Sequence, residues 1–67
     1  MELFGTPLSY FDQVKAYAAY DALVNAKIAV GGMDSGYVKD YNATVWCFTI
    51  KGDTKKAFEI LDQKGLR

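Results

Sequence analysis

The sequence predicts a small α+β domain with an N-terminal helix, a two- or three-stranded antiparallel sheet and a C-terminal helix. Residues 44–50 form a run of β-branched and aromatic side chains, which is typical of a strand. The segment after this run carries helix start and stop signals, and residues from about 7 to 26 lack glycine and are rich in helix formers. At 67 residues the chain is expected to form a single domain over residues 1–67.

Side chains of the strand over residues 44–50 alternate between two faces, and both faces are largely apolar. The larger side chains are Trp46, Phe48 and Ile50. The opposite face carries Val45, Cys47 and Thr49. A strand with two apolar faces is expected to be covered on both sides, unlike a strand that has one face in water.

The C-terminal helix has clear signals at both ends. Gly52 ends the preceding strand, and Asp53 or Thr54 is expected to accept hydrogen bonds from the first amides of the helix. The apolar side of this helix contains Ala57, Phe58 and Leu61. Gly65 lies where a left-handed residue commonly ends a helix, so Leu66 is expected to fold back onto the last turn in a Schellman motif.

The N-terminal helix is expected to begin with Thr6 as N-cap and Pro7 in the first helical position, or at Ser9, and to end near Ala26. One apolar side contains Phe11, Val14, Ala18 and Ala22, extended by Tyr10, Tyr17 and Val24. The other contains Ala16, Ala19 and Leu23. Such a helix is predicted to pack on two sides. Residues 1–5 are expected to form a short strand or a docked arm.

The middle of the chain predicts two short strands and two turns. Residues 27–30 (KIAV) and 37–41 (YVKDY) are the expected strands, and residues 31–36 (GGMDSG) and 40–42 have turn composition. The predicted α-β-β-α order resembles small regulatory modules built as half of a ferredoxin-like sheet. This resemblance implies that a second copy completes the sheet.

Composition also favours self-association. A chain of this length has a marginal core and often depends on disulfides, metals or oligomerisation. One cysteine cannot form an internal disulfide, and a chain without histidine or a cysteine cluster is not expected to bind a structural metal. The remaining way to stabilise the core is self-association, in which another copy completes the sheet or covers a helix face.

Charge and hydropathy exclude several classes of partner. Eight basic and eight acidic residues give zero net charge, so no positive field attracts duplex nucleic acid or an anionic membrane. The sequence shows no leader segment and no apolar run near the roughly 18 residues of a membrane span. A cytoplasmic location is therefore expected.

Catalysis is not expected, because the residue types that it needs are missing or badly placed. The chain has no histidine, and Cys47 has no neighbouring base that would form its thiolate. Asp12 and Asp21 lie more than two helical turns apart, which is too far for a working carboxylate pair. We therefore expect neither enzyme activity nor a cofactor.

Two segments are candidates for binding a small anionic ligand. Backbone amides of a glycine-rich loop can hold a phosphate, and the candidates of this kind are Gly31, Gly32, Ser35 and Gly36. Lys55 and Lys56 lie at the expected N-terminus of the second helix, which attracts anions. The simpler interpretations are a connecting turn and a solvated helix start, because Asp34 repels anions and Asp53 fills the cap position.

Tyrosine gives the stronger functional signal, because it is favoured where one end of a side chain is dry and the other is wet. The chain has five tyrosines among its 67 residues. The candidate interface residues are Tyr10, Tyr17, Tyr20, Tyr37, Tyr41, Val45 and Cys47. The alternative is that the tyrosines form the rim of the core.

Two functions follow as hypotheses. The first is a non-enzymatic regulatory module that self-associates and binds a protein partner through a tyrosine-rich surface; a small phage-type inhibitor of a host complex is one form of it. The alternative is an oligomeric sensor or sequestering protein that holds an anionic or nucleotide ligand at the subunit interface.

Overall fold

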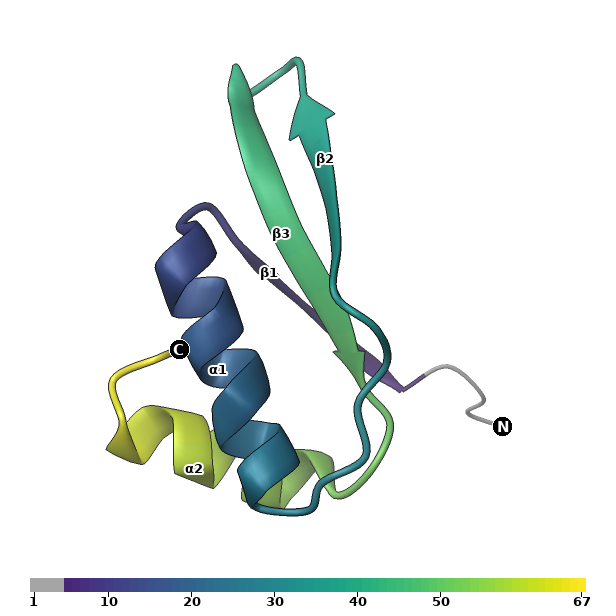
Figure 1. The fold of residues 1–67 in the computed structure, drawn as a ribbon, viewed down its shortest axis with the longest axis vertical. Coiled ribbons are helices and arrows are strands. Elements are labelled where there is room, and N and C mark those ends of the chain that lie inside the picture. The colour runs from purple at the N-terminus through teal and green to yellow at the C-terminus, as the bar shows by residue number, and fades with distance from the viewer. Residues whose placement is uncertain (1–4) are drawn as a thin grey trace.

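The computed structural model describes residues 5–67, which form five elements in the order β-α-β-β-α (Figure 1). The strands are β1 (Thr6–Tyr10), β2 (Asp34–Val38) and β3 (Ala43–Ile50). The helices are α1 (Gln13–Asn25) and α2 (Thr54–Gln63). The predicted α+β class is confirmed, but the α-β-β-α order needs correction because β1 precedes the first helix. Most of the segment 1–5, expected to be a strand or arm, lies outside the described residues.

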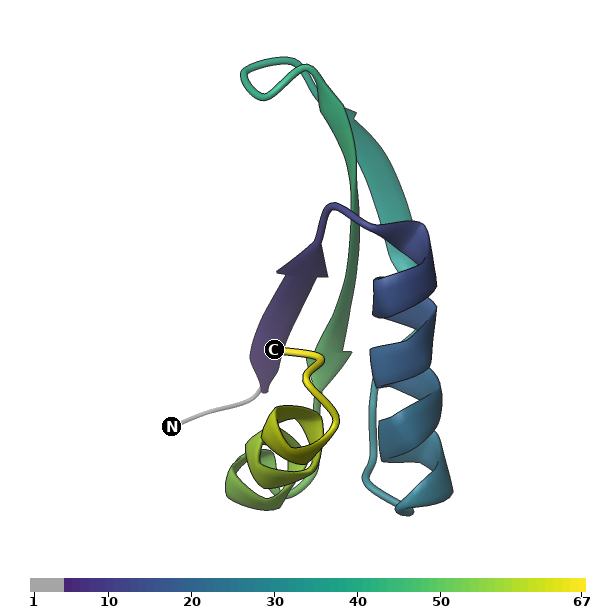
Figure 2. The ribbon, with the colours of Figure 1, turned by 90° about the vertical axis from the view of Figure 1, so that its left-hand side faces the viewer.

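The sheet has the strand order β1-β3-β2, and both neighbours of β3 run antiparallel to it. Strands β1 and β2 are therefore parallel to each other on either side of β3, and α1 makes the crossover between them. Both helices lie on one face of the sheet, which gives a two-layered domain only 16 Å thick (Figure 1, Figure 2). The helices leave the opposite face of the sheet uncovered.

The core lies between β3 and the two helices. Phe48 and Ile50 are buried on the helix-facing side of β3, as the sequence predicts for this face. Buried helix residues of the same cluster are Ala19, Leu23, Ala57 and Leu61. Ile28, just after α1, joins this cluster with 7% of its surface exposed.

The C-terminal helix is confirmed together with its end signals. Asp53 is the N-cap, and its Oδ1 accepts a hydrogen bond from the N–H of Lys56 at 3.1 Å. At the other end Gly65 has a φ of +68°, and the N–H of Leu66 donates to the carbonyl of Leu61 at 2.9 Å. This bond is the six-to-one hydrogen bond of a Schellman motif.

The predicted helix start at Thr6 and Pro7, or at Ser9, is wrong because residues 6–10 form β1. Burial alternates along this segment: its even-numbered residues are half-buried, whereas Pro7 and Ser9 are exposed. An edge strand tolerates proline because a nitrogen that faces away from the sheet needs no N–H. Helix α1 begins after Asp12, whose Oδ1 accepts the N–H of Val14 at 2.9 Å.

Helix α1 buries one of its two predicted apolar sides within the domain. The side with Ala16, Ala19 and Leu23 is fully buried against the sheet and α2. On the other side, Val14 and Tyr17 are exposed. Small alanine side chains allow α1 to approach its neighbours closely, which explains why this side packs inward.

The strand predicted over residues 27–30 is wrong, because these residues end α1 and leave it. Lys27 has a φ of +63°, and the N–H of Ile28 donates to the carbonyl of Leu23 at 3.0 Å. This is a second Schellman motif, with lysine in the position that Gly65 occupies after α2. The predicted helix end near Ala26 agrees with the observed C-cap at Ala26. A left-handed lysine is uncommon, so Lys27 is not recognisable from its residue type as the closing residue of this motif.

Strand β2 lies at Asp34–Val38, three residues before the strand predicted over 37–41. The last three residues of the predicted GGMDSG turn therefore belong to the strand, and residues 39–42 form the turn into β3. Asp34 lies opposite Cys47, and Val30 makes an isolated bridge with Ile50. Between these two pairs, the three residues 31–33 lie opposite only two residues of β3, 48 and 49. The one additional residue makes a β-bulge next to Gly31 and Gly32.

Exchange of lysine and glycine between the two Schellman motifs should have opposite effects. Both positions are left-handed, and a Cβ at Gly65 would meet nothing within 4 Å, so backbone conformation decides the result. We expect Lys27→Gly to raise the free energy of unfolding by about 0.5–1 kcal/mol and Gly65→Lys to lower it by about as much. Denaturant titration followed by circular dichroism measures both; a loss of stability in Lys27→Gly would contradict the motif.

Candidate functional site

Large apolar side chains gather in the open where the start of α1 meets the β2–β3 hairpin. We call this group the aromatic surface; its members are Phe11, Val14, Tyr17, Tyr37 and Tyr41. Their exposed fractions are 61%, 77%, 45%, 62% and 67% in that order. Apolar residues with this much exposure are individually ordinary, but a group of them on neighbouring elements makes this region a candidate interaction site.

A direct contact joins the two elements that carry the aromatic surface. The rings of Phe11 and Tyr41 meet edge to face, with centroids 5.5 Å apart and an interplanar angle of 80°. Phe11 lies just before α1, and Tyr41 lies in the turn between β2 and β3, which extends beyond the first turn of α1 (Figure 1). This contact links the hairpin turn to the segment just before α1.

The turn of residues 39–42 places the tyrosines of the hairpin. Asn42 has a φ of +52°, a left-handed conformation that asparagine tolerates better than most residues. The N–H of Tyr41 donates to the carbonyl of Val38 at 3.2 Å, and the Tyr37 hydroxyl donates to the side-chain oxygen of Asn42. The polar end of Tyr37 is therefore oriented while its ring stays exposed.

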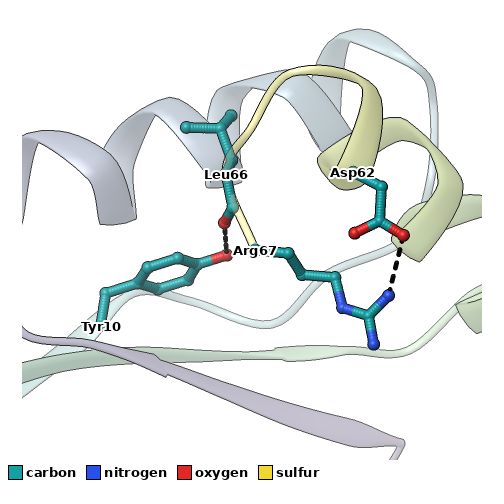
Figure 3. A network of polar contacts seen from close by, with 4 residues as sticks. All are labelled: Tyr10, Asp62, Leu66 and Arg67. Carbon is teal, nitrogen blue, oxygen red and sulfur yellow. Dashed lines mark hydrogen bonds and ion pairs between the residues drawn. The ribbon is translucent and has the colours of Figure 1, made fainter.

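Two of the predicted interface tyrosines are half-buried at the rim of the core instead of lying in the aromatic surface. Tyr20 meets the ring of Phe48 edge to face at 5.4 Å, and Tyr10 stacks on the same ring at 6.4 Å. The Tyr10 hydroxyl donates to the carbonyl of Leu66 at 2.7 Å (Figure 3). Burial raises the pKa of the Tyr10 hydroxyl above its usual value, and the positive charge of Arg67 partly offsets this.

Sequence reasoning missed Phe11 and Val14, because it assigned both to a packed stripe of the helix. Asp12 is the N-cap, which places Phe11 outside the helix altogether. The cap signal was present in the sequence, since aspartate is a preferred N-cap residue. The Thr6-Pro7 pair also matches a helix start, and the prediction placed the N-terminus of the helix there instead of at Asp12.

The uncovered face of the sheet is hollowed beside Gly36. The register puts Gly36 opposite Val45 and Asp34 opposite Cys47, so these residues share the face away from the helices. Because Gly36 has no side chain, an open hollow of about 290 Å³ lies next to it. Val45 and Cys47 stay half-buried, so the expected cover over this face of β3 is not provided by residues 5–67.

The structure does not gather the glycine-rich candidates into an anion-binding loop. Gly31 and Gly32 lie before β2, and the N–H of Gly31 donates to the carbonyl of Thr49 at 2.7 Å. Ser35 and Gly36 lie in β2, where successive N–H groups point in opposite directions. Amides arranged in this way cannot converge on one phosphate.

Lys55 and Lys56 are exposed in the first turn of α2. The N–H of Lys56 is already bonded to the Asp53 carboxylate, which occupies the site where an anion would bind. Within residues 5–67, no group of three or more acidic or cysteine side chains is placed to hold a metal ion. Neither of the two described helices is long and apolar enough to cross a membrane.

Comparisons of the chain with protein-family models, curated proteins and solved structures gave no match.

The Tyr10 hydrogen bond predicts a specific dependence of stability on pH. Tyr10→Phe should lower the free energy of unfolding by about 1 kcal/mol at neutral pH, because the Leu66 carbonyl loses its donor. Since the folded pKa of Tyr10 is raised, its contribution is present below the unfolded pKa of about 10 and is lost as the pH rises through the folded pKa.

The measurement is the difference in free energy of unfolding between wild type and Tyr10→Phe, by denaturant titration from pH 7 to pH 11. We expect a constant difference up to about pH 9 and a shrinking one above about pH 10. A difference that widens at alkaline pH would contradict the assigned role.

Proposed function

We propose that this protein is a non-enzymatic interaction module that associates with a copy of itself and binds a protein partner through the aromatic surface. The observation that carries the proposal is the exposure of Phe11, Val14, Tyr17, Tyr37 and Tyr41 around one edge-to-face contact. A module of this kind acts by occupying a surface of another protein, as a small inhibitor of a larger complex does.

The composition of the aromatic surface matches the centre of a protein interface. Aromatic residues are enriched and charged residues depleted in such centres, and tyrosine is common among the residues that dominate binding energy. Charged residues border the surface here: Asp12 and Lys15 lie beside it at the start of α1, and Lys39 and Asp40 flank it in the hairpin turn. An apolar centre with a polar rim is the usual arrangement of a protein-binding site.

Order in the exposed side chains also favours binding. The Phe11–Tyr41 contact and the Tyr37–Asn42 hydrogen bond restrict three aromatic rings before any partner arrives. Side chains that are already restricted lose less conformational entropy on binding. The same contacts are not needed to build the core, which lies under the helices.

Replacement of Tyr17 and Tyr41 by serine should weaken partner binding roughly 10- to 100-fold, because each truncation of a central aromatic anchor costs at least about 1 kcal/mol. Both side chains are exposed, so the fold should stay cooperative. The partner is first identified by photo-crosslinking from position 41, and its affinity for the purified protein is then measured by calorimetry.

Lys55→Ser with Glu59→Ser is the matched control, because both residues are exposed on α2. The control should bind the crosslinked partner as tightly as wild type. Equal affinity in the tyrosine variant, or equal loss in the control, would refute the aromatic surface as the binding site.

A further inference from the structure

We propose that the outer edge of β2 pairs with the outer edge of β2 in a second copy, antiparallel, about a two-fold axis at Gly36. This inference rests on the self-association in the proposed function and specifies its site. Two three-stranded sheets would join into one with the order β1-β3-β2-β2-β3-β1.

The hydrogen bonds beside β2 identify its outward backbone groups. The N–H of Gly31 donates to the carbonyl of Thr49, so odd-numbered residues of β3 direct their backbone groups toward β2. Even-numbered residues of β2 lie opposite them in the register and complete these bonds. Ser35 and Tyr37 therefore direct their N–H and C=O groups away from β3, toward solvent.

The distal part of the hairpin lacks a third strand. Strand β1 pairs with residues 46–50 of β3, whereas β2 pairs with residues 43–47. Residues 43–45 and their partners 36–38 thus form a two-stranded ribbon that projects past α1 (Figure 1). An isolated two-stranded ribbon is marginally stable in water, so a further strand at this edge stabilises it.

The two edges of the sheet differ in their capacity for pairing. By the same alternation the outward residues of β1 are Pro7 and Ser9, and Pro7 has no N–H to donate. Proline on an edge strand hinders pairing with another strand. At the β2 edge both outward residues keep N–H and C=O; the N–H of Ser35 also touches the Asp34 carboxylate at 3.2 Å, a weak bond that a carbonyl can replace.

One register satisfies all outward groups of both copies. When Gly36 lies opposite Gly36 of the second copy, Ser35 lies opposite Tyr37 of the second copy, and each such pair can exchange two hydrogen bonds. The glycines then form a non-hydrogen-bonded pair with Cα atoms about 4.5 Å apart. Because neither has a side chain, nothing obstructs this approach on the axis.

Charge does not oppose pairing between two copies. The net charge of the chain is zero, so two copies approach without net repulsion.

Pairing about an axis perpendicular to the sheet keeps both pairs of helices on one face. The aromatic surfaces of the two copies would then lie on the same side of the joined sheet, with the two Tyr37 side chains flanking the axis. Two linked surfaces raise the avidity for a partner that offers two sites.

The first test compares the same substitution at the two edges. Ser35→Pro removes an outward N–H at β2, and Ser9→Pro removes one at β1. Sedimentation equilibrium of the full chain over a hundredfold dilution, without any partner protein, should show a dimer for wild type and for Ser9→Pro. For Ser35→Pro the dimer dissociation constant should rise roughly 10- to 100-fold, because two symmetric hydrogen bonds are lost.

A second pair of variants keeps the test decisive should a proline variant fail to fold. A Cβ at Gly36 or at Gly32 would meet nothing within 4 Å, so each position accepts a side chain in the single chain. Gly36→Lys places two like charges side by side on the axis and should dissociate the dimer at least about tenfold more readily. Gly32→Lys, off the axis, should leave it unchanged.

Hydrogen exchange of the Tyr37 amide reports the contact directly, and it should slow as wild-type protein is concentrated. A wild-type dimer that survives Ser35→Pro and Gly36→Lys would overturn pairing at β2 and leave self-association standing. A dimer that dissociates only in Ser9→Pro would assign the contact to β1. A wild-type monomer at every concentration would refute both the pairing at β2 and self-association as a whole. Binding of a partner to the aromatic surface is judged separately, by the Tyr17 and Tyr41 variants.

Discussion

Burial of Phe48 and Ile50 beneath both helices is the interaction on which the other elements depend. Strand β3 is the one described strand with a neighbour on each side, and its helix-facing side chains contact α1 and α2 together. Full burial of a side chain of this size contributes about 1.5–3 kcal/mol. In a domain with a stability of only some 5–15 kcal/mol, two such residues are a large share.

Both helices end in a Schellman motif, and both motifs add contacts to this small core. Each Schellman motif turns the chain back so that an apolar residue, Ile28 after α1 and Leu66 after α2, packs on the core cluster. The second closure is held further by Tyr10 from β1 and by Arg67, which pairs with Asp62 at 3.0 Å (Figure 3). These closures add hydrogen bonds and apolar contacts to the core at the ends of both helices.

The features that the core does not use are the ones on which the proposed function rests. The aromatic surface adds nothing to the core cluster, and the β2 edge offers backbone groups that β3 does not use. The β2 edge lies on the hairpin, which projects from the two-layered body, and the aromatic surface joins this hairpin to the start of α1. An exposed apolar group and an unprotected strand edge promote aggregation in a protein that stays monomeric. In the proposed complex, each would be covered by another chain.

The sequence by itself determined the α+β class, strand β3 with its core face, and α2 with Asp53 and Gly65 at its ends, because local patterns and tertiary packing agree there. Tertiary structure alone decided that residues 6–10 form an edge strand, since Thr6-Pro7 suits a helix start and an edge strand equally well. It also decided the place of β2, which the register against β3 sets.

For the candidate site, the sequence pointed to tyrosines, but only packing against Phe48 separates Tyr10 and Tyr20 from the exposed Tyr17, Tyr37 and Tyr41. The side of α1 that turns inward is chosen by the shape of its neighbours, and a helical repeat does not contain that information.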